Sequence, residues 1–262
     1  MRGLVGQLGR WVDEQGLDRC EWVEGPSRRR RRGDDVVTTS KGELRAPGAT
    51  TPVRVTRRVT ETRDGWAHVE VELVVPDELA DPPRVGVEWR LPGELERLEW
   101  YGDGPHECYP DRRASATVRR WATTVSDTYV DYVLPQEHGH RTGLRWLALA
   151  PTRPRRGSAS GLVVVADERS GTSLGFSARH LSDEQLWTAR HTSDLQPSVE
   201  VTHLHLDAAQ RGLGTGSCGP DALERYRIPA GRHRIGVWVA AFDPRAVDAA
   251  DLLAAAPPPT SP

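Results

Sequence analysis

This chain lacks the residues that disulfide pairing and membrane insertion require. The three cysteines, Cys20, Cys108 and Cys218, lie far apart and form no CxxC pair. An odd number of cysteines without a framework argues against a disulfide-stapled secreted scaffold and predicts reduced thiols in the cytoplasm. No stretch approaches the roughly 18 apolar residues of a membrane-spanning helix, and the N-terminus has no apolar core of signal-peptide length. The sequence therefore predicts a cytoplasmic protein without a membrane partner.

An excess of charge of one sign is also missing. The chain has 35 basic and 37 acidic residues, so its formal net charge of −2 favours neither nucleic acid nor an anionic membrane as a partner. Nearly all the basic residues are arginine, since Lys41 is the single lysine. The one dense cluster is the run Arg28–Arg32, with turn-forming residues on both sides in Gly25–Ser27 and Gly33–Asp35. This setting predicts a mobile surface loop rather than a phosphate-binding surface.

Alternation of apolar and polar residues with period two is the dominant positive signal. With 262 residues, 37% of them hydrophobic, the chain is long enough to bury a sizeable core. Alternating apolar residues predict strands at Val69–Val75, Val85–Leu91 and Ile235–Val239, and a continuous apolar run predicts one at Leu162–Val165. Val53–Thr62 is a further strand candidate because it is rich in Val and Thr. Alternation that leaves one face of each strand wet is typical of stacked antiparallel sheets.

Helical patterns are scarce. Ser182–Gln185 has the capping-box signature of a short helix, and Ala246–Ala255 is the second candidate, before a Pro-rich tail. The sequence therefore predicts an all-β fold, a large antiparallel sandwich with few short helices. We divide the chain into a leading segment, residues 1–35, that packs on a neighbour and carries the arginine loop, a sandwich domain, residues 36–245, and a terminal helix with its tail, residues 246–262.

No pair of carboxylates stands out as catalytic. Retaining glycoside hydrolysis needs two carboxyl groups about 5 Å apart. Most acidic residues alternate with apolar ones and are expected to be solvated, among them Glu70, Glu72, Glu88 and Glu200. Glu107 and Glu137 lie among Pro, Gly and Tyr in fixed turns, where bonding loop amides is the expected role. The sequence thus offers no catalytic residue.

Four histidines allow two other kinds of chemistry. His203 and His205 are two apart on a predicted strand and share a face, a spacing compatible with zinc, but no third ligand falls in register. His138 and His140 flank Gly139 in a loop, where they contact a sugar or face water. A histidine beside a carboxylate is the acid–base combination of aldose epimerases, which keeps an independent aldose 1-epimerase as an alternative.

Cys218 lies in an unusually glycine-rich segment. Glycines at 212, 214, 216 and 219 and a proline at 220 indicate a tightly turned backbone that approaches another surface closely. A nucleophilic cysteine needs a nearby base, and the local sequence provides none. An inert thiol is therefore the expectation from the residues alone.

Three long motifs occur in a fixed order along the chain. They are WYGDGPHECYPDRR at Trp100–Arg113, PQEHGHRTGLRWLAL at Pro135–Leu149 and LHLDAAQRGLGTGSCGPD at Leu204–Asp221. In this order they resemble the C-terminal small-chain domain, domain 5, of the family 2 β-galactosidases, over roughly Gly16–Val239. The resemblance implies a galactose-mutarotase-like supersandwich.

The resemblance also implies a missing partner. In the family, a (β/α)₈ barrel carries both catalytic glutamates and the magnesium site, so no cofactor and no catalytic residue is expected in this chain. The loop matching GLGTGSCGP reaches into the sugar pocket of the barrel, which makes Cys218, with Ser217 and Gly219, the candidate substrate-binding residues. The chain departs from the family pattern at His138, where PQENG is usual.

The resemblance implies that this chain is the small-chain component of a β-galactosidase, an enzyme that hydrolyses terminal β-D-galactose residues. This component is expected to be inactive without a large catalytic chain or barrel domain. Such a domain alone is a split subunit, a truncated remnant or a gene model that starts late. A missing barrel is expected to leave an apolar face exposed, so the isolated chain should self-associate or be marginally stable. A non-catalytic carbohydrate-binding module, with Trp100, Trp121 or Trp146 as stacking platforms, is the other alternative.

Overall fold

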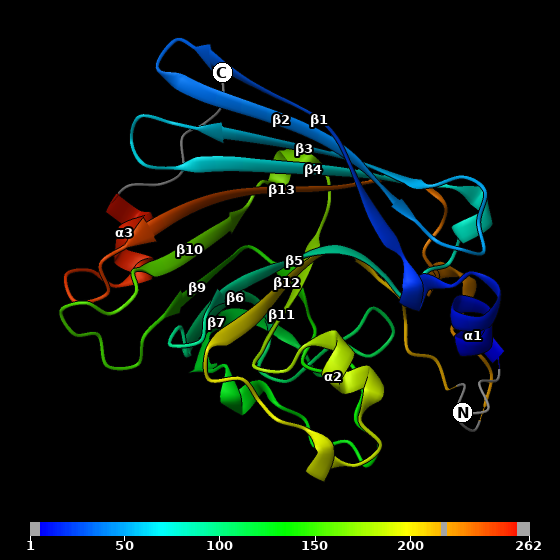
Figure 1. The fold of residues 1–262 in the computed structure, drawn as a ribbon. Helices are drawn as coiled ribbons and strands as arrows, with labels where there is room; N and C mark the ends of the chain where they lie inside the picture. The colour runs from blue at the N-terminus through cyan, green and yellow to red at the C-terminus, as the bar shows by residue number, and fades with distance from the viewer. Residues whose placement is uncertain (1–5, 216–218, 256–262) are drawn as a thin grey trace.

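Two antiparallel sheets pack face to face in the computed structural model, which describes residues 6–215 and 219–255 (Figure 1). The nine-stranded sheet has the order β1 Glu21–Arg32, β2 Asp35–Arg45, β3 Val53–Glu61, β4 Ala67–Val75, β13 Gly231–Phe242, β10 Gly161–Ala166, β9 Trp146–Ala150, β6 Arg97–Gly104 and β7 Thr117–Thr124. The four-stranded sheet has the order β5 Arg84–Pro92, β12 Val201–Gln210, β11 Leu174–Arg179 and β8 Arg141–Leu144. The α-helices of the described residues are short: α1 Gly6–Gly9, α2 Asp183–Thr188 and α3 Ala249–Ala255. The predicted all-β class is confirmed.

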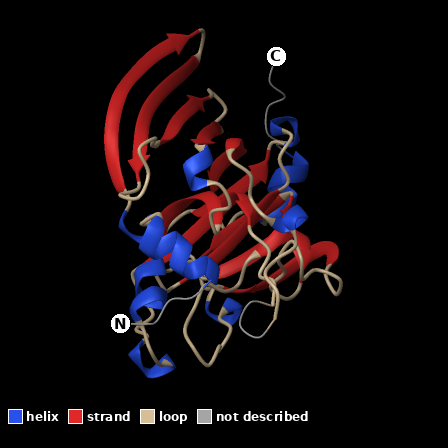
Figure 2. Ribbon diagram, turned by 90° about the vertical axis from the view of Figure 1, so that its right-hand side faces the viewer, coloured by secondary structure: helices blue, strands red, loops and turns tan. Residues whose placement is uncertain are grey.

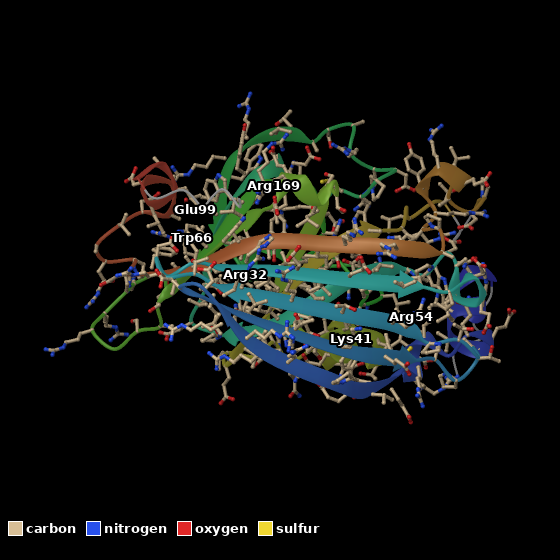
Figure 3. All side chains as sticks on the ribbon, turned by 90° about the horizontal axis from the view of Figure 1, so that it is seen from above. Arg32, Lys41, Arg54, Trp66, Glu99 and Arg169 are labelled. Carbon is tan, nitrogen blue, oxygen red and sulfur yellow. The ribbon has the colours of Figure 1, made fainter. Side chains whose placement is uncertain are left out.

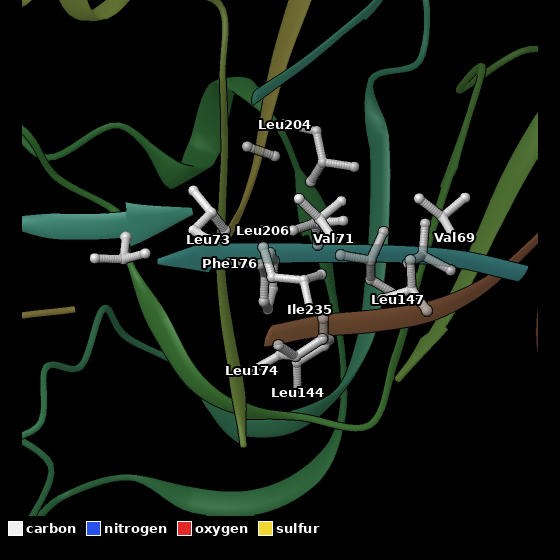
Figure 4. Packing of buried hydrophobic residues seen from close by; sticks show 14 of the residues in the cluster. Val69, Val71, Leu73, Leu144, Leu147, Leu174, Phe176, Leu204, Leu206 and Ile235 are labelled. Carbon is white, nitrogen blue, oxygen red and sulfur yellow. The ribbon is translucent and has the colours of Figure 1, made fainter. Parts of the chain in front are cut away.

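The main core lies between the two sheets. On β4 the apolar members of the alternation, Val69, Val71 and Leu73, are buried, while Glu70 is exposed on the opposite face. They face buried side chains of the four-stranded sheet such as Phe176 (Figure 4). Full burial of each large aliphatic or aromatic side chain contributes roughly 1.5–3 kcal/mol. This core explains why strands were predictable from period-two alternation.

The short helices follow local signals in the sequence. Ser182 Oγ accepts from the Gln185 amide at 3.2 Å, and Gln185 Oε1 accepts from the Ser182 amide at 3.0 Å, which confirms the capping box of α2. Helix α3 begins at Ala249, three residues later than predicted. Ala249 is buried in a second, smaller core with Trp238 and Phe242 of β13.

The arginine run is a strand, and the prediction of a mobile loop is wrong. Arg28–Arg32 forms the end of β1 and pairs antiparallel with β2, from Arg28↔Thr39 to Arg32↔Asp35. Gly33, with φ of 63°, makes the tight turn between the two strands. Because β1 is an edge strand with most residues exposed, long charged side chains are tolerated there and discourage pairing with another chain. For this reason the sequence of β1 does not show the alternation of apolar and polar residues that predicts a strand.

The strands at one end of the large sheet curve away from the rest of the sandwich (Figure 2). Figure 3 shows the face of this sheet that points away from the four-stranded sheet, with Arg32, Lys41 and Arg54 across it. Some of its charges are paired, for example Arg232 and Arg234 with Glu72 at 2.9 and 3.1 Å. This outer face is polar, as expected for a sheet with one solvated side.

The segment before β1 packs on this same chain. Trp11 Nε1 donates to the Asp81 carbonyl at 2.7 Å, and Gln15 Nε2 donates to the Glu78 carbonyl at 2.9 Å. Within this chain, the segment therefore contacts the turn around Asp77–Leu79. Since β1 and β2 form one hairpin, paired backbone also crosses the predicted boundary at residue 35.

Candidate functional site

The three sequence motifs come together in space. The Cys108 amide donates to the His140 carbonyl at 2.7 Å, which joins the first motif to the second. The Asp111 carboxylate joins the first motif to the third, because it accepts from the amides of Leu213 and Gly214 at 3.0 and 2.7 Å. Segments separated by about a hundred residues in the sequence therefore form one continuous region.

Glu107 holds the first two motifs together. Its carboxylate accepts from the Gly139 amide at 2.8 Å and contacts Arg112 and the Tyr132 hydroxyl. Burial works to raise the pKa of Glu107, but these donors outweigh it and hold the pKa below its ordinary value. Glu107 thus bonds a loop amide, as expected, and Glu137 instead accepts from the Tyr109 hydroxyl at 2.8 Å.

The base of the glycine-rich loop is pinned from outside. Both Asp111 oxygens are used, one for each of the two amides that open the loop. A Cβ on Gly212 would lie 2.8 Å from Asp111 Oδ2, so a side chain there would push the carboxylate away. Glycine at 212 is therefore required by close packing.

Arg211 clamps both ends of the same loop. Its Nε and Nη2 donate to the two oxygens of Asp81 at 2.7 and 3.0 Å, and its Nη1 and Nη2 donate to those of Asp221 at 3.0 and 2.7 Å. The hydrogen bonds from Arg211 hold the pKa of Asp221 below its ordinary value. The guanidinium also lies 5.4 Å from the centre of the Trp11 ring. The leading segment therefore helps to support the loop.

The candidate substrate-binding residues fall within this glycine-rich segment of the sequence. The Thr215 amide donates to the Pro220 carbonyl at 3.1 Å and closes the loop. Ser217 and Cys218 fall outside the described residues. Gly219 is exposed, and a Cβ there would lie 2.6 Å from Thr215 Oγ1. Asp111 and Arg211, which hold the loop, were missed, and their only signal was their position within the motifs.

The histidines are built into the fold. His138 and His140 are each 1% exposed, so the expectation that they face water is wrong. His138 Nδ1 lies 3.0 Å from the Gln136 carbonyl, and His203 pairs with Glu88. His205 Nε2 lies 3.0 Å from Arg179 Nη2. Within residues 6–215 and 219–255, no group of three or more His, Cys, Asp or Glu side chains is arranged to hold a metal ion.

Trp100 is not available as a stacking platform. It is 1% exposed, and its Nε1 donates to the Asp103 carbonyl at 2.9 Å. The Arg141 guanidinium covers its ring at 4.6 Å from the centre. Trp121 and Trp146 are partly buried on the large sheet. The carbohydrate-binding-module alternative therefore loses the first of its three platforms.

Two buried histidines predict acid sensitivity. Burial, with Arg84 and Arg179 nearby, lowers the pKa of His205 from 6.5 to about 2, and burial lowers the pKa of His138. Both are neutral in the folded state, whereas the unfolded chain binds protons below about pH 6.5. Stability is thus fully present well above pH 6.5 and is lost as the pH falls, for His205 by about 1.4 kcal/mol between pH 7.5 and 5.5.

Urea denaturation at pH 7.5 and 5.5 measures this loss. The His205→Gln variant should lose less stability over that interval than the wild-type chain, since one of the two titrations is removed. An equal loss in the two proteins would contradict the assignment to His205.

The chain is thus an antiparallel β-sandwich with a glycine-rich loop whose ends are held by Asp111 and Arg211. The family model described as "Beta galactosidase small chain" matches residues 7–238. The chain belongs to the β-galactosidase small-chain family. Its relatives include a β-galactosidase from Arthrobacter sp. (strain B7), 39% identical over 147 residues. A β-galactosidase from Staphylococcus xylosus is 29% identical over 166 residues.

These relatives are much longer than the matched region. The aligned residues are 56% of this chain but 14% of the Arthrobacter protein, and 63% of this chain but 16% of the Staphylococcus protein. A solved structure of a putative aldose 1-epimerase from Escherichia coli K12 covers 83% of this chain, and the match spans 68% of that structure, with 10% identity and a TM-score of 0.42. Among the described residues, no helix is long and apolar enough to cross a membrane.

Proposed function

We propose that this chain is the small-chain component of a β-galactosidase and completes the sugar pocket of a separate catalytic barrel. The observation that carries the proposal is the clamped loop of Gly212–Asp221 in a chain whose family match spans residues 7–238. Asp111 fixes the base of this loop and Arg211 joins its two ends, so the described ends of the loop have a defined position from which a partner can be contacted. Cys218, Ser217 and Gly219 are the residues that we assign to the pocket wall.

The chemistry is assigned to the partner. Retaining hydrolysis of a terminal β-D-galactose needs two carboxyl groups, one as nucleophile and one as acid and base. In this proposal the barrel supplies both, together with the magnesium ion, and the small chain binds and orients the sugar. Cytoplasmic location is part of the same proposal, supported by the free thiols of Cys20 and Cys108.

Exposed apolar side chains around the loop support a docking role. Leu213 and Leu223 are 44% and 57% exposed on either side of the loop tip. Val133 is 98% exposed and directly follows Tyr132. The Tyr132 hydroxyl accepts a hydrogen bond from Arg112, the residue after Asp111. Exposed apolar side chains are a common feature of protein interfaces. In this proposal the barrel docks on the side of the chain that carries Leu213 and Leu223.

Complementation tests the proposal. The purified chain is assayed on a chromogenic β-galactoside alone, and again after mixing with a large-chain fragment that ends after the barrel. Activity is expected only in the mixture. Activity of the chain alone would show a carboxylate pair in this chain and overturn the proposal, and inactivity of a mixture of two folded proteins would overturn it as well.

A further inference from the structure

An unusual helical turn in the leading segment fixes this segment to the turn that precedes β5. Residues Arg10–Glu14 form a π-helix, which the Gln15 amide closes by donating to the Arg10 carbonyl at 2.9 Å. Turns of this kind are rare and occur frequently at functional sites. Three side chains of the segment donate to three carbonyls of the neighbouring turn, at 3.1, 2.7 and 2.9 Å: Arg10 to Ala80, Trp11 to Asp81 and Gln15 to Glu78.

Trp11 contacts both partners of the ion pair between Asp81 and Arg211. Its Nε1 donates to the Asp81 carbonyl, and its ring centre lies 5.4 Å from the Arg211 guanidinium. A cation over an aromatic face is attracted to the ring. Trp11 therefore favours the position of the guanidinium in which it bonds both carboxylate oxygens of Asp81.

The backbone of Asp81 needs the support that Trp11 gives. Its φ of 61° lies in the left-handed region, and among the described residues Asp81 is the one position other than glycine with a positive φ. Aspartate adopts this conformation more readily than most residues, but at a cost that the surroundings offset. The Asp81 amide is fixed by the Ile228 carbonyl at 2.7 Å, and the Asp81 carbonyl is fixed by Trp11. Loss of the indole therefore releases one side of this residue.

The ion pair connects the leading segment to the glycine-rich loop. Arg211 directly precedes the loop, and its guanidinium bonds both oxygens of Asp221 at the other end. The orientation of Arg211 toward Asp221 thus depends on Asp81 and Trp11, which hold its other contacts. We infer that Trp11 is a positioning residue for the two ends of the glycine-rich loop and acts through Asp81 and Arg211.

The coupling between the leading segment and the loop is reciprocal. Whatever holds the ends of the loop must stabilise the docked leading segment by the same free energy with which the docked segment stabilises the loop. A galactoside or a partner that binds the loop is therefore expected to protect the leading segment as well. That last expectation rests on the proposed function, whereas the coupling itself is a property of the isolated chain.

Amide hydrogen exchange of the isolated chain tests the role of Trp11. The reporters are the amides of Gly212 and Thr215, which donate to the carbonyls of Tyr226 and Pro220. Trp11→Leu removes both the donor and the aromatic ring and should speed exchange of these amides by about tenfold. Trp11→Phe keeps an aromatic ring and should restore part of the protection. If Trp11→Leu does not fold, Trp11→Phe provides the same comparison with a smaller expected effect.

Two controls separate positioning from a general loss of stability. Trp22→Leu is the matched substitution, because Trp22 lies on β1 with its ring against Gly42 and its Nε1 bonded to Glu24 at 2.8 Å. Exchange of the loop amides should be unchanged in this variant. The amide of the fully buried Val237 in β13 reports global unfolding. Trp11→Leu should speed the loop amides by more than it speeds the Val237 amide.

A double-variant cycle tests the route through Arg211. Asp221→Ala removes the last link, so adding Trp11→Leu to it should change loop exchange by less than about twofold. Three results would overturn the role of Trp11: unchanged loop exchange in Trp11→Leu, equal acceleration of the loop and Val237 amides, or the full effect of Trp11→Leu in the Asp221→Ala background. None of these measurements uses a catalytic partner, so an inactive complementation mixture would sink the proposed function and leave this test intact.

Discussion

Replacement of Asp111 by alanine is expected to lower complemented β-galactosidase activity by about 100-fold, since misplacing a pocket group by an ångström costs about that much. The substitution removes both acceptors for the Leu213 and Gly214 amides and releases the base of the loop. In the proposed function this loop contacts the sugar, and the variant loses the bonds that fix Leu213 and Gly214 at the start of the loop. Because the proposal assigns contacts and no proton transfer to the loop, KM should rise as well as kcat fall. Steady-state kinetics of the mixture measures both.

Matched variants separate a positioning role from loss of folding. Asp111→Asn keeps one acceptor oxygen and should recover part of the activity. Asp251→Ala removes an exposed carboxylate from α3 and should leave activity unchanged. Wild-type kinetics in Asp111→Ala, with a normal complex by gel filtration, would refute the role of Asp111, while the proposed function would stand on the wild-type mixture.

Most of the fold was predictable because burial imprints a pattern on the strands. Val69–Val75 was recognised from side chains that alternate between core and solvent, and Val53–Thr62 from its Val and Thr content. Strands β4 and β3 match these ranges within two residues. At Arg28–Arg32 that cause is missing, since β1 packs one edge against β2 and neither face enters the core. Edge strands free of burial carry no period-two signal, and only the observed pairing reveals them.

The candidate site was predictable in outline and not in its contacts. Dense glycine, proline and aspartate marked the motifs, because tight turns need those residues. The partners of Arg211 were not visible, since Asp81 is 130 residues away. Such contacts depend on how segments distant in the sequence are brought together, and no local sequence pattern indicates them. The assignment of Cys218 and Ser217 stays a prediction.

Replacement of Arg211 by methionine is expected to destabilise the chain by about 3–5 kcal/mol, the usual cost of removing one partner from a buried ion pair. The Arg211 side chain is 5% exposed, and Asp81 keeps a carboxylate that is 10% exposed and has lost its main counter-charge. The backbone of Asp81 is also fixed, with φ of 61°, by bonds to Ile228 and Trp11. The carboxylate therefore cannot easily turn to solvent. Urea denaturation at pH 7.5 measures the loss.

A second substitution identifies the cause of that loss. Asp81→Asn in the Arg211→Met background removes the uncompensated charge and should restore part of the stability, so the two effects are not additive. Arg232→Met breaks an ion pair with Glu72 in which the arginine side chain is 57% exposed, and should cost no more than about 1 kcal/mol. If Arg211→Met costs no more than Arg232→Met, the ion pair with Asp81 does not stabilise the chain, and the loop is then held by Asp111 and by backbone bonds such as that from Thr215 to Pro220.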